Sequence, residues 1–429
     1  MNNRFNDKSR LFASGKILPF ILITALFFFW GIPNNLNDVL IKQFMKSFEI
    51  TRLKAGFIQS AFYMGYFLLS MPAALLMKKY SYKTGLVVGL FLYSIGTLLF
   101  WPAAIVGQYG FFLFALFVIA SGLAFLETGA NPYIAVMGPP ETSERRLNFS
   151  QAFNPLGAIT GVLIGTIFIF SGIELGHEEI DTLKLAGEYN GYLQEETMRV
   201  VIPYIILGCV VFLWALLIIK TKFPKVADEA KPKEKREKGR FRDLLKYPHF
   251  YKGVIAQFFY VGAQVGTWSY FIQYVQDYTS QPEKAAGYFL TGSLIAFGIG
   301  RFIATYLMKF IKPNVLMGYF GVANVLLVAI GVIFPGWIGL WAIFFTSFFM
   351  SLMFPTIFAL GIKELGPNTK IGGSMIIMAI IGGAVFTPVM GLVFELTKSM
   401  AIAMTVPLIC YAFITYYAFI GSRVRVSLT

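Results

Sequence analysis

Long apolar runs with few charges are the feature of this chain that most constrains its fold. Twelve stretches approach the roughly 20 mostly apolar residues that cross a bilayer as a helix. A helix satisfies its backbone hydrogen bonds within itself, as the lipid interior requires. The sequence therefore predicts an all-α membrane protein with twelve transmembrane helices. Their expected centres are Phe27, Leu68, Leu92, Phe117, Thr160, Leu207, Tyr260, Ala296, Leu326, Phe348, Ile381 and Leu408.

Composition supports this prediction. Only 14% of the residues are charged and 57% are hydrophobic, whereas soluble domains average about 25% charged residues. A formal net charge of +14 would suggest a nucleic-acid partner for a soluble protein. Here the basic residues fall between the apolar runs, so a lipid bilayer is the expected partner and nucleic acid is not.

The loop charges predict the orientation of the chain. Lys and Arg are concentrated before the first apolar run, after the second and after the sixth, whereas the segment after the fifth is rich in Glu. Cytoplasmic loops favour Lys and Arg, so both termini are expected in the cytoplasm and the acidic segment outside. One basic group disagrees, because it falls on the predicted outer side between the first two helices: Lys42, Lys46, Arg52 and Lys54.

An internal repeat with a period near 230 residues divides the chain. Phe28 matches Phe259 and Gly31 matches Gly262, both at an offset of 231 (259 − 28 and 262 − 31). The motif LMK recurs at 76–78 and 307–309, and the motif GP at 138–139 and 366–367. Two parallel six-helix halves resemble the major facilitator fold, whose substrate site lies near the bilayer midplane between the halves. The expected parts are a cytoplasmic tail (1–16), a six-helix half (17–220), a cytoplasmic basic linker (221–246), a second six-helix half (247–421) and a cytoplasmic tail (422–429).

Two carboxylates are predicted inside the membrane. Asp38 ends a polar run that begins at Asn34, and Glu127 follows about fifteen apolar residues. Acids at such depth are costly and usually face a cavity, and desolvation disfavours their charged form. We therefore hypothesise that both acids exchange protons. The alternatives are a helix-end position for Asp38 and a hydrogen bond between Glu127 and a neighbouring helix.

Amides and aromatic rings form the second group of candidates. Gln151 and Asn154 are three residues apart in the fifth apolar run, and amides donate and accept hydrogen bonds as sugar hydroxyls require. Gln257, Gln264 and Trp268 lie in the seventh run. Interhelical hydrogen bonding is the alternative role for the amides, and a place at the membrane interface is the alternative for the tryptophan.

Enzymatic chemistry is not indicated. Cys209 and Cys410 lie within apolar runs and are expected to be packing residues, and no metal-ligand spacing occurs. The chain contains no nucleophile–base motif and no glycine-rich nucleotide loop beside a strand. We therefore expect neither a metal nor a cofactor, and we do not expect an enzyme.

Several of these segments resemble the fucose–galactose–glucose permease family of the major facilitator superfamily. The similar segments are 30–38 (WGIPNNLND), 126–133 (LETGANPY), 146–154 (RLNFSQAFN), 256–264 (AQFFYVGAQ) and 381–391 (IGGAVFTPVMG). The resemblance covers nearly all of both halves. It implies that Asp38 and Glu127 match the two essential carboxylates of the family and that Asn35, Gln151 and Asn154 contact the sugar. Trp30 and Asn131 lie in the same motifs and are further candidates.

The resemblance also implies a function. It is that of a monomeric secondary transporter in the cytoplasmic (inner) membrane, importing L-fucose or a closely related monosaccharide with protons by alternating access. The transmembrane proton gradient would be the energy source. Pro33, Pro155 and Phe354 depart from the family pattern, which leaves the sugar open. The alternatives are a glucose, galactose or other hexose transporter, possible sodium coupling, and a non-transporting sugar sensor, against which the short expected tails argue.

Overall fold

The computed structural model describes residues 17–137, 149–223, 244, 246–308, 310–365 and 369–423. These residues are helical nearly throughout. Within them, eleven helical segments are long and apolar enough to cross a membrane. They are Ile17–Ser47, Arg52–Met77, Tyr82–Val106, Tyr109–Asn131, Phe149–Ile169, Tyr189–Lys220, Glu283–Leu307, Pro313–Ile333, Trp337–Gly361, Met375–Thr397 and Met400–Gly421.

One further long helix, α13 (Pro248–Thr279), occupies the seventh expected position. It has 32 residues, begins with a proline at its first position and ends at Ser280 in the left-handed conformation. It is not among the eleven because glutamines at 257, 264 and 273 interrupt its apolar sequence. The eleven segments and α13 are consistent with the predicted twelve crossings. The expected N-terminal tail, most of the C-terminal tail and most of the linker at 221–246 lie outside the described residues.

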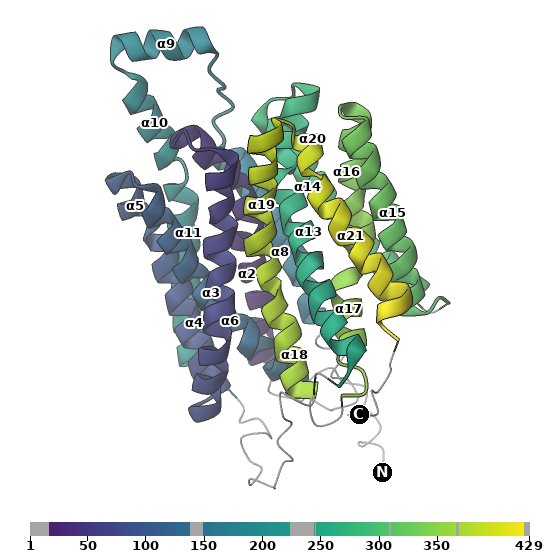
Figure 1. Cartoon of the computed structure of the whole chain (residues 1–429). Helices are drawn as coiled ribbons and strands as arrows, with labels where there is room; N and C mark the ends of the chain where they lie inside the picture. The colour runs from purple at the N-terminus through teal and green to yellow at the C-terminus, as the bar shows by residue number, and fades with distance from the viewer. Residues whose placement is uncertain are drawn as a thin grey trace, which may run out of the picture. The chain divides into compact units, whose positions relative to one another are not determined.

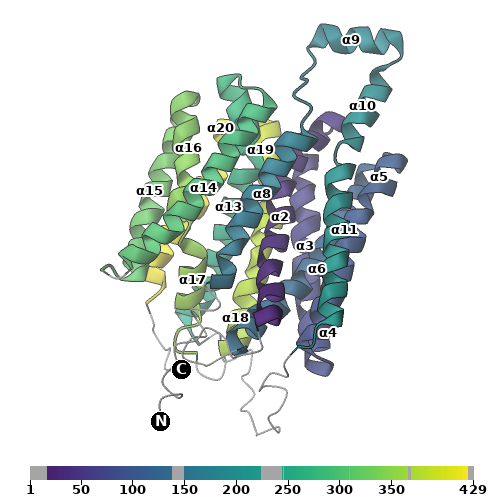
Figure 2. The ribbon, with the colours of Figure 1, turned by 180° about the vertical axis from the view of Figure 1, so that it is seen from behind.

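The chain forms two compact units, which are described separately. Unit 1 comprises Met1–Asn37, Met64–Ile169 and Lys184–Lys235. In it α4 packs against α6 and α11, as Figure 2 shows. A side chain at Gly122 of α6 would meet the backbone of Gly89 and Tyr93 in α4, so small residues let these backbones approach. Its helices are α4 (Tyr82–Leu98), α5 (Phe100–Val106), α6 (Tyr109–Val136), α8 (Phe153–Ile164), α10 (Tyr189–Met198), α11 (Val201–Lys220) and parts of α2 (Ile17–Ser47) and α3 (Arg52–Lys79).

Unit 2 comprises Asp38–Tyr63, Phe170–Leu183 and Arg236–Thr429. In it α13 packs against α14, α17, α19 and α21, and α15 packs against α16 and α21 (Figure 1). Besides α13 it contains α14 (Glu283–Leu307), α15 (Pro313–Ile333), α16 (Trp337–Met350), α17 (Met353–Gly361), α18 (Thr369–Met378), α19 (Gly382–Thr397), α20 (Met400–Ala403) and α21 (Thr405–Tyr416). Most of the short helix α9 (His177–Ala186) also belongs to it.

Both α2 and α3 pass from one unit into the other. Their segment Asp38–Tyr63 packs with the C-terminal helices of unit 2. The contact is close, since a side chain at Gly56 of α3 would meet the backbone of Pro388 in α19. The Ser60 hydroxyl donates to the backbone oxygen of Ala384, 2.6 Å away. The ends of α2 and α3 nearest their shared turn are therefore joined to helices that follow more than 200 residues later in the chain.

Corresponding helices of the predicted repeat pack in the same way. A side chain at Gly157 of α8 would meet the backbone oxygen of Phe28 in α2. A side chain at Gly382 of α19 would meet the backbone oxygen of Phe258 in α13. The two phenylalanines are 230 residues apart (258 − 28). The fifth helix thus approaches the first through a glycine in both predicted halves.

Candidate functional site

The carboxyl group of Asp38 forms one corner of a closed hydrogen-bond triangle in unit 2. Its Oδ1 accepts from Gln59 Nε2 of α3 and from Ser269 Oγ of α13, both at 2.9 Å. Gln59 Nε2 also donates to Ser269 Oγ at 2.9 Å. The exposed fractions of Asp38, Gln59 and Ser269 are 2%, 1% and 0%. The position of Asp38 is therefore interior and not a helix end, because α2 continues to Ser47.

Sequence reasoning singled out Asp38 but missed both of its partners. Gln59 lies within an apolar run, and nothing near it in the sequence marks it as part of a site. Ser269 carried a signal that was not used: it follows Asp38 by 231 residues (269 − 38), the offset of the Phe28–Phe259 pair. Ser269 is thus the repeat equivalent of the carboxylate that it contacts.

In unit 1, Glu127, Asn131 and Gln151 form a short polar chain. Asn131 and Glu127 lie one helical turn apart in α6, and Asn131 Nδ2 donates to the backbone oxygen of Glu127 at 3.1 Å. Gln151 Nε2 donates to Asn131 Oδ1 at 3.3 Å. The Glu127 side chain is half-buried and Gln151 is exposed. Among the described residues the Glu127 carboxyl has no hydrogen-bond partner, so it is available to a ligand or a proton.

The remaining candidates of unit 1 are in or against α2. Trp30 and Asn35 are buried, and the Trp30 ring lies 4.3 Å from that of Phe27, measured between centroids. Asn154 is half-buried, and its Nδ2 donates to the backbone oxygen of Phe27 at 3.3 Å. This bond gives Asn154 a part in joining α8 to α2 and leaves its oxygen for another donor.

The candidates of the seventh helix differ in their surroundings. Gln257 is fully buried, and neither polar atom of its amide has a hydrogen-bond partner among the described residues. Gln264 is half-buried. Trp268 is held in place, because its Nε1 donates to Ser347 Oγ at 3.0 Å and its ring meets Phe297 edge-on at 5.3 Å. A buried amide without a partner is costly, so Gln257 is suited to meeting a polar ligand or water.

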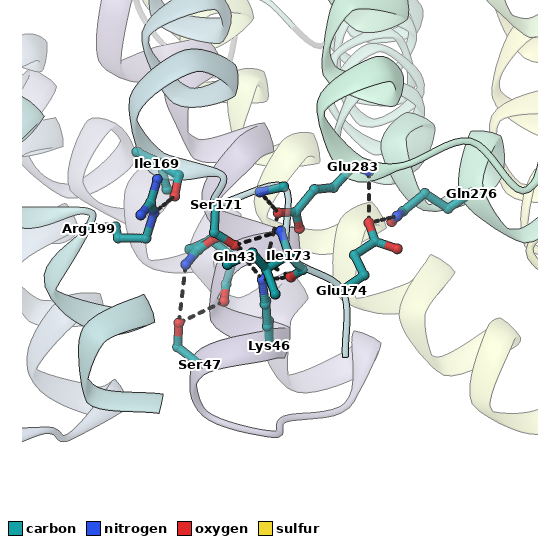
Figure 3. A network of polar contacts seen from close by, with 11 residues as sticks. Gln43, Lys46, Ser47, Ile169, Ser171, Ile173, Glu174, Arg199, Gln276 and Glu283 are labelled. Carbon is teal, nitrogen blue, oxygen red and sulfur yellow. Dashed lines mark hydrogen bonds and ion pairs between the residues drawn. The ribbon is translucent and has the colours of Figure 1, made fainter. Parts of the chain in front are cut away.

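Charged groups gather at the turn between α2 and α3, as Figure 3 shows. Lys46 Nζ donates to Ser171 Oγ at 2.8 Å and lies 3.7 Å from a carboxylate oxygen of Glu283. That oxygen accepts from the backbone nitrogen of Gly172 at 3.0 Å. One oxygen of Glu174 accepts from Gln276 Nε2 at 2.6 Å and from the backbone nitrogen of Glu283 at 2.7 Å. The segment Phe170–Leu183 is thereby attached to α2, α13 and α14.

The second ion pair at this end joins Arg52 to Asp277. Its two hydrogen bonds are 2.6 and 2.8 Å long, and the guanidinium lies 3.7 Å over the Phe394 ring. Together with Lys46–Glu283, this pair accounts for two of the basic residues that disagreed with the predicted orientation. Their charges are balanced by acids far along the chain, so they do not act as the unpaired charges that orient loops.

No group of three or more His, Cys, Asp or Glu side chains that could hold a metal ion is found within the described residues. Of the two cysteines, Cys209 is exposed and Cys410 is buried, and both are free thiols. The polar groups that the structure brings together are carboxyls, amides and hydroxyls on helices. Such groups can bind a polyhydroxylated ligand and exchange protons.

Comparison with known proteins gives consistent results. Residues 20–387 match the family model of the Major Facilitator Superfamily. The L-fucose-proton symporter of Escherichia coli is 42% identical, with 96% of this chain and 95% of the relative covered. A glucose/galactose transporter of Brucella abortus is 34% identical, with 94% and 93% covered. A crystal structure of the E. coli fucose:proton symporter matches with a TM-score of 0.70 and 41% identity, covering 95% of this chain and 99% of that one.

Proposed function

Because this chain belongs to the major facilitator superfamily, we propose that it is a multi-pass inner-membrane symporter that imports L-fucose or a closely related monosaccharide together with protons. The observation that carries this proposal is the 42% identity to an L-fucose-proton symporter over nearly the whole of both chains. The glucose/galactose relative shares 34% identity over a similar length. Glucose or galactose transport, with proton or sodium coupling, is therefore the second candidate.

Two carboxylates carry the proton in this proposal. Asp38 is supported by its burial and by its hydrogen bonds to α3 and α13. Glu127 is supported by a carboxyl that has no hydrogen-bond partner among the described residues and adjoins the amides of Asn131 and Gln151. The proton gradient is the energy source, so the transport cycle needs no cofactor. The transporter acts as a monomer, with both termini in the cytoplasm.

The sugar is bound by amides and aromatic rings. We assign Asn35, Asn131, Gln151 and Asn154 to its hydroxyls in unit 1, with Trp30 beside them. Gln257, Gln264 and Trp268 are the corresponding candidates of unit 2. The unpartnered amide of Gln257 and the exposed amide of Gln151 support this assignment, since each has hydrogen-bonding capacity that the described residues leave unused.

Uptake into proteoliposomes tests the function as a whole. Purified protein is reconstituted, and radiolabelled L-fucose is supplied with an inward proton gradient, with an inward sodium gradient, or with neither. We expect accumulation above the outside concentration only with the proton gradient. Excess L-fucose should abolish it, whereas excess D-glucose should not. Accumulation driven by sodium, or blocked equally well by D-glucose or D-galactose, would favour the second candidate instead.

The assignment of the sugar amides predicts a loss of affinity. Replacing Gln151 or Asn154 by alanine removes one partner of a neutral hydrogen bond that the bound sugar would cover, and such a loss typically costs about 1–3 kcal/mol. The sugar dissociation constant should therefore rise roughly 5- to 150-fold in either variant. Isothermal titration of the purified protein with L-fucose measures this change.

A matched control lies in the same helix. The hydroxyl of Thr160 bonds to the backbone oxygen of Leu156 within α8, so Thr160→Ala should leave the affinity within about twofold of the parent. Thermal unfolding separates binding from structure, because Asn154 also joins α8 to α2. A variant that binds L-fucose as tightly as the parent at an unchanged unfolding temperature would assign that amide to helix packing alone.

A further inference from the structure

We propose that Gln59 and Ser269 are positioning residues, through which the protonation state of Asp38 controls the closure of α13 against α2 and α3. This inference rests on the proposed role of Asp38 in coupling. It adds two residues that act on the proton only through their hydrogen bonds to that carboxyl.

All donors of the triangle are in use. The Gln59 amide has two N–H hydrogens, one directed to Asp38 Oδ1 and one to Ser269 Oγ. The Ser269 hydroxyl has one hydrogen, directed to Asp38 Oδ1. This oxygen therefore receives two donors and acts only as an acceptor. A proton on Oδ1 would face two other hydrogens, so the observed triangle fits a form of Asp38 in which this oxygen is unprotonated.

Protonation of Oδ1 requires the triangle to rearrange. The Gln59 side chain can turn its amide so that Oε1 faces Asp38, because Oε1 has no hydrogen-bond partner among the described residues. Oε1 would then accept a hydrogen bond from the protonated acid. The same turn of the amide would break the bond from Gln59 Nε2 to Ser269 Oγ. A proton on the other carboxyl oxygen leaves the triangle in place but weakens it, because hydrogen bonds to an ionised acceptor are stronger than those to a neutral one. Protonation at either oxygen therefore weakens the closed structure. The triangle therefore stabilises closure more strongly when Asp38 is ionised than when it is protonated.

The bond from Ser269 gives this chemistry a mechanical consequence. Asp38 and Gln59 belong to the first and second helices, whereas Ser269 belongs to the seventh. In alternating access the two predicted six-helix halves move against each other, and separation of α13 from α2 removes the Ser269 donor from Asp38. Proton uptake is then favoured while these helices are apart, and proton release is favoured once they close. This order suits a symporter whose proton enters before closure at this end.

Several other charged groups of this region are held in ion pairs. Lys42 lies one turn beyond Asp38 in α2, and charged side chains from each neighbouring element act on it. They are Glu174 from the segment Phe170–Leu183, Glu283 from α14, Arg52 from α3 and Asp277 from α13. The ion pairs Lys46–Glu283 and Arg52–Asp277 hold several of them. The two donors that complete the triangle with Asp38, the Gln59 amide and the Ser269 hydroxyl, are neutral.

The repeat supports a specific role for Ser269. The position equivalent to the acid, 231 residues later, carries a hydroxyl that cannot titrate in the physiological range. One half thus contributes the titrating group and the other contributes the donor that senses it. This is a functional use of the unequal polarity of the two halves.

The experiment compares uphill accumulation with gradient-free exchange in proteoliposomes. Ser269→Ala and Gln59→Leu should lower the accumulation ratio by roughly tenfold, the effect of losing one hydrogen bond to a charged group, while exchange stays within about twofold. Ser269→Thr keeps the hydroxyl and should restore accumulation. Thr279→Ala is the control, because the Thr279 hydroxyl bonds to Val275 within α13. When Asp38 is already asparagine, adding Ser269→Ala should change exchange no further.

Each outcome separates this inference from the proposed function. If Asp38→Asn alone still accumulates sugar, the coupling assignment of Asp38 fails, and this inference fails with it. If Asp38→Asn loses accumulation but both Ser269→Ala and Gln59→Leu retain it, only this inference is overturned. If Ser269→Ala lowers exchange and accumulation equally and Ser269→Thr restores neither, Ser269 is a packing residue and the inference is again overturned.

Discussion

Replacing Asp38 with asparagine should abolish uphill accumulation of sugar while leaving sugar exchange intact. Asparagine has the size of protonated aspartic acid but cannot take up or release a proton. Its Oδ1 can still accept from Gln59 and Ser269, so the packing of α2, α3 and α13 should persist. The helices can then close and reopen around sugar, but no proton is carried with it. The proton gradient consequently cannot drive the accumulation of sugar.

The two activities are measured in the same vesicles. With equal sugar on both sides, exchange of radiolabelled L-fucose should remain within a few-fold of the parent. With an imposed inward proton gradient, the ratio of inside to outside sugar should fall to about one. Glu178→Gln is the control, since it removes an exposed acid of α9 and should alter neither activity. A variant at Asp38 that concentrates sugar as well as the parent would remove Asp38 from the coupling mechanism.

The helices were predictable because their signal is local. A run of about 20 apolar residues is stable in lipid only as a helix. Each segment can therefore be predicted without knowing which other helices it packs against. The seventh helix was predicted as one of the twelve apolar stretches, although its glutamines weaken the apolar signal. The same glutamines place polar groups in the interior, since Gln257 and Gln273 of α13 are both buried.

The partners of the polar residues were not predictable, because they are remote in sequence. Asp38 stood out as an acid in an apolar run, yet its donors lie 21 and 231 residues away. Lys46 and Arg52 looked like an exception to the charge rule because the sequence does not show that Glu283 and Asp277 reach them. Charge patterns in loops are read as if every group were exposed, and ion pairs between distant segments break that assumption.

The candidate sugar amides were only partly predictable from the sequence. Their residue types and spacing indicated a polar face, and the structure joins Asn131 of α6 to Gln151, two residues before the start of α8. Whether an amide binds a ligand or a neighbouring helix depends on which of its atoms are already used. Asn154 donates to Phe27, whereas the amide of Gln257 has no partner among the described residues. The sequence does not show which amides are already bonded to a neighbouring helix, whereas the structure does.

Replacing Glu127 with glutamine should also uncouple transport from the proton gradient, and it should weaken sugar binding more than Asp38→Asn does. The two acids differ in their surroundings. Oδ1 of Asp38 accepts from Gln59 and Ser269, whereas the carboxyl of Glu127 has no hydrogen-bond partner among the described residues and adjoins Asn131 and Gln151. A sugar that binds these amides would meet the Glu127 carboxyl as well.

The expected magnitudes follow from the bonds lost. Glutamine retains one acceptor but replaces the other carboxyl oxygen with an N–H₂ group, so a sugar hydroxyl that donates to that oxygen loses its partner. The sugar dissociation constant should rise roughly tenfold, whereas Asp38→Asn should change it by less than about threefold. Glu127→Asp keeps a titrating group and should retain part of the accumulation. If Glu127→Gln binds sugar as the parent does and still accumulates it, Glu127 is neither a ligand contact nor a coupling group, and the proton pathway then depends on Asp38 alone.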